Sequence, residues 1–232
     1  KNEKLKIKNL KVVSCSMLAP GAYNYILNIK LRDRIEAFYV NDLTLDLGDK
    51  IYISRYRSIH RKVDNEEAVV EYLSKRGFIK ICAEDYSIIE LISIMMHAKY
   101  FVGMVSAGLT HMMFMKEGFV LELIHEDFIC PTNDIWPGGY TEKYSGVNYY
   151  SMANGLGLNY LYQPCKRVYL NEYLLADNIL VDMPKLKENI EKVIRYIPKE
   201  KYENIFKGAY NRTEKYVKKP SNRTRKLKNY LP

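Results

Sequence analysis

The stretch Lys99-Tyr-Phe-Val-Gly-Met-Val-Ser-Ala-Gly-Leu-Thr-His111 decides how the rest of the chain is organised. Its aromatic and β-branched residues 100–102 are typical of a buried strand, and apolar residues 109–115 follow at helical spacing. A strand that runs through small residues into a helix presents backbone N–H groups and a helix dipole to an anion. The stretch therefore predicts a phosphate-binding turn, with a turn that only packs tightly as the alternative.

The two glycines of this turn narrow the choice of ligand. The spacing Gly103-x4-Gly108 imitates that of a P-loop, but Leu109 and Thr110 stand where an ATPase loop needs a lysine. An ATPase loop is therefore excluded. Gly108 either lets a ligand approach the backbone closely or lets the turn pack closely against the sheet.

Short apolar segments and helical segments alternate on both sides of the turn. Expected strands lie at 5–18, 51–54, 78–82, 119–124 and 159–162, and expected helices at 24–39, 66–76, 88–96, 149–156 and 184–197. Strands that alternate with helices of about ten residues are typical of βαβ crossovers and of a parallel sheet covered on both faces. We therefore predict an α/β fold with a Rossmann-like parallel sheet over residues 43–197.

Side-chain patterns indicate how some of these helices begin and pack. The apolar stripe of helix 24–39 consists of Ile26, Ile29, Ile35 and Phe38. Arg32 falls on the outer face of that helix. Asp64 or Asn65 is the expected N-cap of the second helix, and Ser87 with Glu90 forms a capping box for the third.

The composition bounds the class of protein. A chain of 232 residues with 47% hydrophobic and 27% charged residues fits one large or two small folded domains. No apolar run approaches the ~18 residues of a membrane span, and the first residues do not resemble a signal peptide. The four cysteines are scattered without a Cys-x-x-Cys pair, so they indicate no metal site and leave the compartment open. We expect a chain that is soluble as given.

The positive charge is concentrated at the C-terminus. Residues 198–232 hold eleven Lys or Arg against three Glu, which accounts for +8 of the net charge of +9. A basic tail of this kind suits contact with an anionic surface, or it serves only solubility. The 21 tyrosines are spread throughout the chain and form no recognised RNA-binding motif, so we expect no specific nucleic acid partner.

Several blocks of the sequence occur in an order that is known from one enzyme family. They are Ile53-Ser54-Arg55, Arg61, Asn65-Glu66, the turn Gly103–Thr110 and Val120-Leu-Glu122-Leu. In this order and at about these spacings, they resemble the C-terminal half of the family 61 glycosyltransferases. Segments 153–160 and 179–182 are similar to that family as well, so the likeness covers roughly residues 45–197.

The resemblance implies a GT-B-type glycosyltransferase, in which two Rossmann-like domains face each other and the donor lies mainly on the C-terminal one. This chain would then have a reduced or missing N-terminal domain. We expect residues 1–42 to be a remnant or edge of the acceptor-side domain, residues 43–197 to be the nucleotide-sugar-binding domain, and residues 198–232 to be a basic tail.

The resemblance also implies an inverting transfer of a hexosyl or pentosyl group. The donor is a nucleotide-diphosphate sugar, and the acceptor is a hydroxyl of a glycan or glycoconjugate. No cofactor and no metal ion are implied, because GT-B enzymes stabilise the leaving diphosphate with cationic side chains and helix N-termini.

The expected donor-binding residues are Arg55, Arg61, Ser106, Ala107, Gly108, Leu109, Thr110 and Glu122. Arg55 follows a strand at the edge where open α/β sheets bind ligands, and its planar fork suits a phosphate. A solvated loop arginine is the alternative. Arg61 is the weaker candidate because it can pair with Glu66 or Glu67. Residues 106–110 would offer N–H groups and two hydroxyls to the diphosphate.

Two further roles concern the ribose and the acceptor proton. Glu122 interrupts an apolar strand, and a buried carboxylate needs partners. Ribose hydroxyls are the partners that the resemblance implies, and a nearby arginine is the alternative. Inversion also needs a general base, for which His111, His125 and Asp127 are weak candidates. The base could equally lie in the acceptor-side half.

The chain departs from the family's pattern in the turn. The family's histidine falls on Val105, and its asparagine after Leu-Thr falls on His111. This departure is compatible with a different donor sugar or with a shifted role for His111. It is also compatible with a non-catalytic nucleotide- or glycan-binding relative, which is the alternative to an active transferase.

Overall fold

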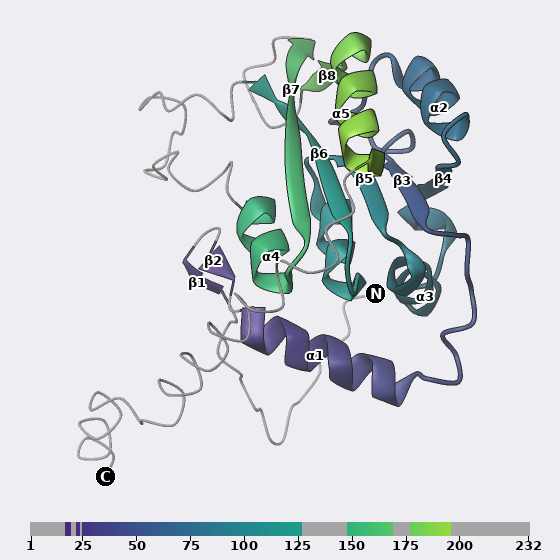
Figure 1. Cartoon of the computed structure of the whole chain (residues 1–232), viewed down its shortest axis with the longest axis vertical. Coiled ribbons are helices and arrows are strands. Elements are labelled where there is room, and N and C mark those ends of the chain that lie inside the picture. The colour runs from purple at the N-terminus through teal and green to yellow at the C-terminus, as the bar shows by residue number, and fades with distance from the viewer. Residues whose placement is uncertain (1–16, 20–21, 24, 127–147, 169–176, 196–232) are drawn as a thin grey trace, which may run out of the picture. The chain divides into compact units, whose positions relative to one another are not determined.

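The computed structural model describes residues 17–19, 22–23, 25–126, 148–168 and 177–195. The chain divides into two compact units, residues 1–193 and 194–232, and the elements below belong to the first, apart from the last two residues of its closing helix. A six-stranded sheet with the order β4-β3-β5-β6-β7-β8 forms the centre of this unit (Figure 1). The α/β class and the largely parallel sheet are therefore confirmed, and the GT-B architecture stays a prediction.

The strands and helices alternate along the chain. The parallel strands are β3 (Lys50–Ser54), β4 (Ile79–Cys82), β5 (Tyr100–Met104), β6 (Phe119–His125) and β7 (Asn159–Val168), and β8 (Asn178–Leu180) runs antiparallel to β7. The α-helices are α1 (Tyr25–Phe38), α2 (Glu66–Ser74), α3 (Ile88–His97), α4 (Asn148–Leu156) and α5 (Met183–Arg195). Two 3-10 helices, η1 (Ala83–Asp85) and η2 (Ala107–Phe114), and a hairpin of β1 (Met17–Ala19) and β2 (Ala22–Tyr23) complete the unit.

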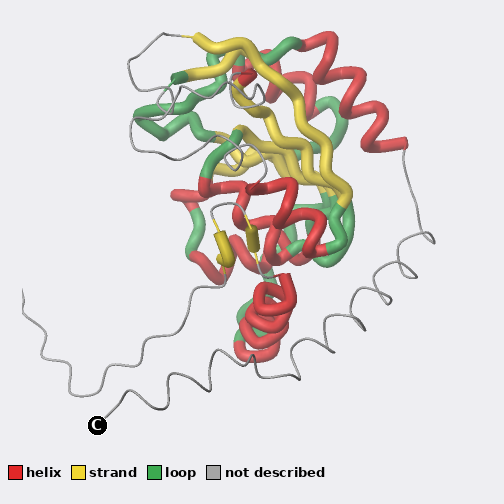
Figure 2. The backbone as a smooth tube through the Cα atoms, turned by 90° about the vertical axis from the view of Figure 1, so that its left-hand side faces the viewer, coloured by secondary structure: helices red, strands yellow, loops and turns green. Residues whose placement is uncertain are grey.

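Helices cover both faces of the sheet, as a parallel sheet requires (Figure 2). On one face, Ile51 and Phe101 belong to an apolar core with residues of α3, η2 and α4. On the other face, Tyr52 bonds to a residue of α2 and Gln163 bonds to a residue of α5. The near-continuous apolar runs that predicted the strands reflect this burial from two sides.

The winding of the sheet reverses between β3 and β5. The chain passes from β3 through α2 to β4 on one side, and α3 then carries it back to β5 on the other side of β3. In open α/β sheets, ligands bind outside the carboxyl ends of the strands at such a reversal. Ile53 pairs with Gly103, so Arg55 and Val105 follow neighbouring strand ends at this point.

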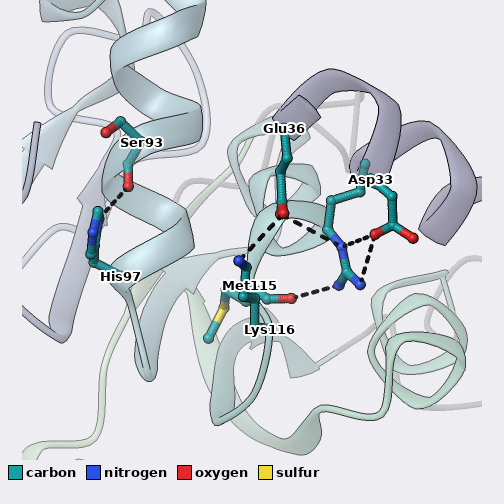
Figure 3. Close-up of polar contacts among 7 residues, drawn as sticks. Asp33, Glu36, Ser93, His97, Met115 and Lys116 are labelled. Atoms are coloured by element: carbon teal, nitrogen blue, oxygen red, sulfur yellow. Dashed lines mark hydrogen bonds and ion pairs between the residues drawn. The ribbon is translucent and has the colours of Figure 1, made fainter. Parts of the chain in front are cut away.

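Polar contacts join α1 to the segment that precedes β6. Arg32 Nη1 donates to the Met115 carbonyl at 3.1 Å, and Lys116 Nζ lies 3.3 Å from Glu36 Oε2 (Figure 3). The Arg32 side chain is therefore 15% exposed and does not lie on the outer face, as the stripe pattern had indicated. A carbonyl partner on a neighbouring segment outweighs helical periodicity here.

Three further expectations differ from the structure. The helix expected at 109–115 is a 3-10 helix that begins at Ala107. Because a 3-10 helix rises about 2.0 Å per residue and an α-helix 1.5 Å, it lets a short segment cover more of the distance from the end of β5 to the start of β6. Phe38 is 78% exposed because it ends α1. β8 has no counterpart among the expected strands.

Other predictions fall where the structure gives no description. Most of the expected strand at 5–18 lies outside the described residues, and so does the basic tail at 198–232. The division at residue 42 likewise stays a prediction. The second helix begins after Asn65, as expected. The Asn65 side chain does not cap that helix, because it exchanges two hydrogen bonds with the Val181 backbone beside β8.

Candidate functional site

The small-residue turn after β5 is held on several sides. Ser106 is buried, and its hydroxyl donates to the Met104 carbonyl at 3.0 Å. The Ser106 carbonyl accepts the Tyr149 hydroxyl of α4 at 2.6 Å and the Leu109 N–H of η2 at 2.9 Å. The backbone of the turn is therefore fixed before any ligand arrives.

The hydroxyl protons that the sequence assigned to a diphosphate are engaged within the chain. Besides Ser106, Thr110 donates its hydroxyl to the Ala107 carbonyl at 2.5 Å. Leu109 is buried, and its N–H makes the first bond of η2 to the Ser106 carbonyl. The N–H groups of Ala107 and Gly108 precede that bond, so the helix cannot satisfy them itself. An anion at this turn would be bound by these backbone donors.

Both glycines allow the turn to pack against β3. A Cβ atom at Gly103 would lie 2.6 Å from Ile53 Cγ2, and a Cβ atom at Gly108 would lie 3.0 Å from Ile53 Cδ1. These contacts favour the packing role that the sequence left open for Gly108. Close packing also brings the start of η2 to the end of β3, which Arg55 follows directly.

Arg55 closes the loop that follows β3. Its Nε donates to the Arg61 carbonyl at 2.9 Å, and its Nη2 donates to Ser58 Oγ at 2.7 Å and to the His60 carbonyl at 3.2 Å. The guanidinium is half-buried, and burial lowers its pKa. Arg55 is therefore a fixed cation at the strand end and not a solvated loop arginine.

A second guanidinium adds to this positive charge. The charge of Arg61 is the next cause that lowers the pKa of Arg55, while Glu84 and Tyr149 raise it. Arg61 itself has φ of +57°, a left-handed conformation that is unfavourable for a side chain other than glycine. In the described part of the chain, Arg61 forms no ion pair with Glu66 or Glu67. Because their charges repel each other, two neighbouring cations favour an anion between them.

Glu122 is a buried carboxylate on the next strand. It is 1% exposed and lies opposite Gly103 in the β5–β6 register. Burial raises its pKa to about 7, and the Tyr160 hydroxyl, which donates to its Oε2, lowers it in part. Among the residues that the structure describes, no arginine pairs with Glu122, and the Tyr160 hydroxyl is its hydrogen-bond partner.

The candidate bases lie in different environments. The His111 Nδ1–H donates to the Gly108 carbonyl at 2.8 Å, which leaves Nε2 as the basic nitrogen of the neutral ring. His125 is buried and pairs with Cys165 in the β6–β7 register. Because side chains alternate along a strand, it points to the face opposite Glu122. Asp127 lies outside the described residues.

Two tyrosines belong to the site although the sequence gave them no role. Tyr149 links α4 to the turn and lies close enough to Arg55 to affect its pKa. Tyr160 is the hydrogen-bond partner of Glu122. The sequence could not indicate Tyr160, because its contact depends on the register that pairs residues 120 and 160 of the neighbouring strands. Nothing in the sequence indicates the contact of Tyr149.

The described residues meet neither the requirements of a membrane-spanning helix nor those of a metal site. No helix in the described ranges is long and apolar enough to cross a membrane. Among the same residues, no three His, Cys, Asp or Glu side chains gather where they could hold a metal ion. Transfer without a bound metal ion remains a prediction.

The sequence of the chain matches a known protein family. The family described as Glycosyltransferase 61 matches residues 4–121, which is half of the chain. The chain belongs to glycosyltransferase family 61. This confirms the resemblance that its motifs indicated and supports glycosyl transfer as the type of reaction. The match contains Arg55, Arg61 and the turn, and it ends one residue before Glu122. No curated protein matches the chain.

Proposed function

We propose that this family 61 protein transfers a sugar from a nucleotide-diphosphate donor to a hydroxyl of a glycan or glycoconjugate, with inversion and without a bound metal ion. The observation that carries the proposal is the placement of two guanidiniums at the reversal of the sheet. Arg55 and Arg61 follow β3, and the start of η2 follows the neighbouring β5. This is the edge where open α/β sheets bind ligands.

The proposed chemistry needs stabilisation of a leaving diphosphate. The sugar–phosphate bond breaks as the acceptor oxygen attacks, and negative charge builds up on the departing nucleoside diphosphate. A diphosphate beside Arg55 and Arg61 would relieve the repulsion between the two cations, while the N–H groups of Ala107 and Gly108 would add hydrogen bonds. Glu122 would accept ribose hydroxyls.

Inversion requires a base that accepts the proton of the acceptor hydroxyl. His111 fits this role best among the described candidates, because its Nδ1 bond to the Gly108 carbonyl leaves Nε2 as the basic nitrogen and the residue belongs to η2 itself. A carboxylate such as Asp127 remains an alternative base. The transferred group, hexosyl or pentosyl, would be selected by groups around the sugar.

The first prediction concerns the two arginines. We expect Arg55→Ala and Arg61→Ala each to raise the Kd for UDP or GDP by about tenfold to a hundredfold, because each removes charge-assisted hydrogen bonds to phosphate. Arg57→Ala is the matched control, since Arg57 lies in the same loop, is exposed and pairs with Asp85. Calorimetric titration measures the Kd. Equal losses from all three variants would contradict the proposal.

A non-catalytic binding protein is the second candidate function. Val105 in the family's histidine position favours it, because valine cannot transfer a proton and the Val105 N–H is occupied by the Leu123 carbonyl. Incubation of the wild type with nucleotide sugars and glycan acceptors separates the two functions. Binding of the nucleotide without release of nucleoside diphosphate would favour the binding protein.

A further inference from the structure

A buried carboxylate lies beside the loop that carries Arg55. Glu66, the first residue of α2, is 8% exposed, and its Oε1 accepts the Tyr52 hydroxyl at 2.8 Å and the Ser54 hydroxyl at 2.7 Å. Lys80 Nζ lies 3.7 Å from Oε2. Burial of a charge is costly unless hydrogen bonds and an opposite charge compensate for it. Three partners surround this carboxylate, and two of them come from β3.

Ser54 connects Glu66 to the loop that follows β3. Its Oγ donates to Glu66 and accepts the Tyr56 N–H at 3.0 Å. Because the hydroxyl proton is directed at Glu66, a lone pair of the same oxygen is available to the Tyr56 N–H. The peptide group between Arg55 and Tyr56 is thereby fixed at the strand end.

We propose that Glu66, acting through Ser54, is a positioning residue for Arg55. The bonds of the Arg55 guanidinium to Arg61 and Ser58 fix the internal shape of the loop. The bond that the Tyr56 N–H donates to Ser54 Oγ fixes that shape relative to β3, which the turn after β5 contacts. The inference rests on the proposed function, because the position of the guanidinium matters only if a diphosphate binds at this edge.

Tyr52 provides a matched control within the same network. Its hydroxyl donates to the same oxygen of Glu66, but among the described residues it makes no hydrogen bond to the loop. Burial and the charge of Glu66 raise the pKa of Tyr52, so its hydroxyl stays a donor. A purely structural network would respond alike to the loss of either hydroxyl. If the network positions Arg55, nucleotide affinity falls when the Ser54 hydroxyl is removed and does not fall when the Tyr52 hydroxyl is removed.

The experiment compares Ser54→Ala with Tyr52→Phe in the full chain. Three quantities are measured: the thermal midpoint, the hydrogen-exchange protection of the Tyr56 amide, and the Kd for UDP and GDP. We expect Ser54→Ala to lose protection at Tyr56 and to raise the Kd by about fivefold to tenfold, while Tyr52→Phe stays within about twofold for a similar fall in midpoint. Glu66→Ala should resemble Ser54→Ala, and Glu66→Gln should recover most of the affinity because its amide oxygen still accepts.

The outcomes separate this inference from the proposed function. A wild type that binds UDP or GDP, together with equal Kd values for Ser54→Ala and Tyr52→Phe, would overturn the inference alone. A wild type that binds neither nucleotide would overturn the proposed function and the inference with it. If Glu66→Ala does not fold, Ser54→Ala and Glu66→Gln still make the comparison.

Discussion

At the scale of single residues, two carboxylic acid side chains near the site are buried away from water. Glu122 and Glu66 are both buried, yet they have different partners. Glu66 accepts two hydroxyls and lies near a lysine, whereas the partner of Glu122 in the described structure is the Tyr160 hydroxyl. The less compensated carboxylate is therefore the one whose protonation should respond to pH in the neutral range.

The pH dependence of stability tests this difference. The pKa of Glu122 rises from 4.5 to about 7 on folding, so between these pH values the folded chain holds a proton that the unfolded chain has released. The contribution of Glu122 to the free energy of unfolding therefore falls as pH rises through this window, by about 3 kcal/mol in all. Glu122→Gln should lack that slope in urea denaturation between pH 5 and pH 8.

Glu117→Gln serves as the control for this measurement, because the Glu117 side chain is 70% exposed. It should follow the wild type at every pH. Parallel curves for the wild type and Glu122→Gln would show that the carboxylate is already ionised at pH 5, and the assigned pKa would be wrong.

At the scale of elements, the site depends on how closely the turn after β5 packs on β3. The sequence predicted a turn with small residues, and it predicted that β3 and β5 lie in one parallel sheet. It could not show that Ile53 lies directly against Gly103 and Gly108, because that contact depends on strand register. The same limit explains why β8 was missed. Its anchor, the pair of bonds between Asn65 and Val181, joins residues 116 positions apart.

A double-mutant cycle tests the packing of the turn. We expect Gly108→Ala to lower the free energy of unfolding by about 1 kcal/mol, because the new methyl group meets Ile53 Cδ1 at 3.0 Å. Ile53→Val removes that Cδ1 atom, so in its background Gly108→Ala should cost much less. Urea denaturation of the four proteins gives the coupling energy. Additive effects would show that the turn does not rest on Ile53.

At the scale of the whole chain, the family match covers only the first part of the compact unit around the sheet, which spans residues 1–193. The family match spans residues 4–121 and therefore includes α1 together with the strands up to the first residues of β6. α1 also makes its polar contacts with the segment before β6. The sequence assigned residues 1–42 to another domain because its motifs begin near residue 45. The contacts of α1 with the segment before β6 involve none of those motifs, so the sequence could not predict them.

The attachment of α1 can be tested without knowledge of the substrate. Arg32→Ala removes the donor of the Met115 carbonyl, so we expect α1 to open more easily, by about 1 to 2 kcal/mol, in hydrogen exchange of its amides. Arg34→Ala is the control, because Arg34 lies on the same helix and is exposed. Amides of β3 and β5 should keep their protection in both variants, since the buried core around these strands includes residues of α3, η2 and α4, and α1 adds only partly buried residues to it. If instead Arg32→Ala weakened the protection of α1, β3 and β5 together, α1 would be an integral part of the cooperative unit, and the boundary near residue 42 would have to be abandoned.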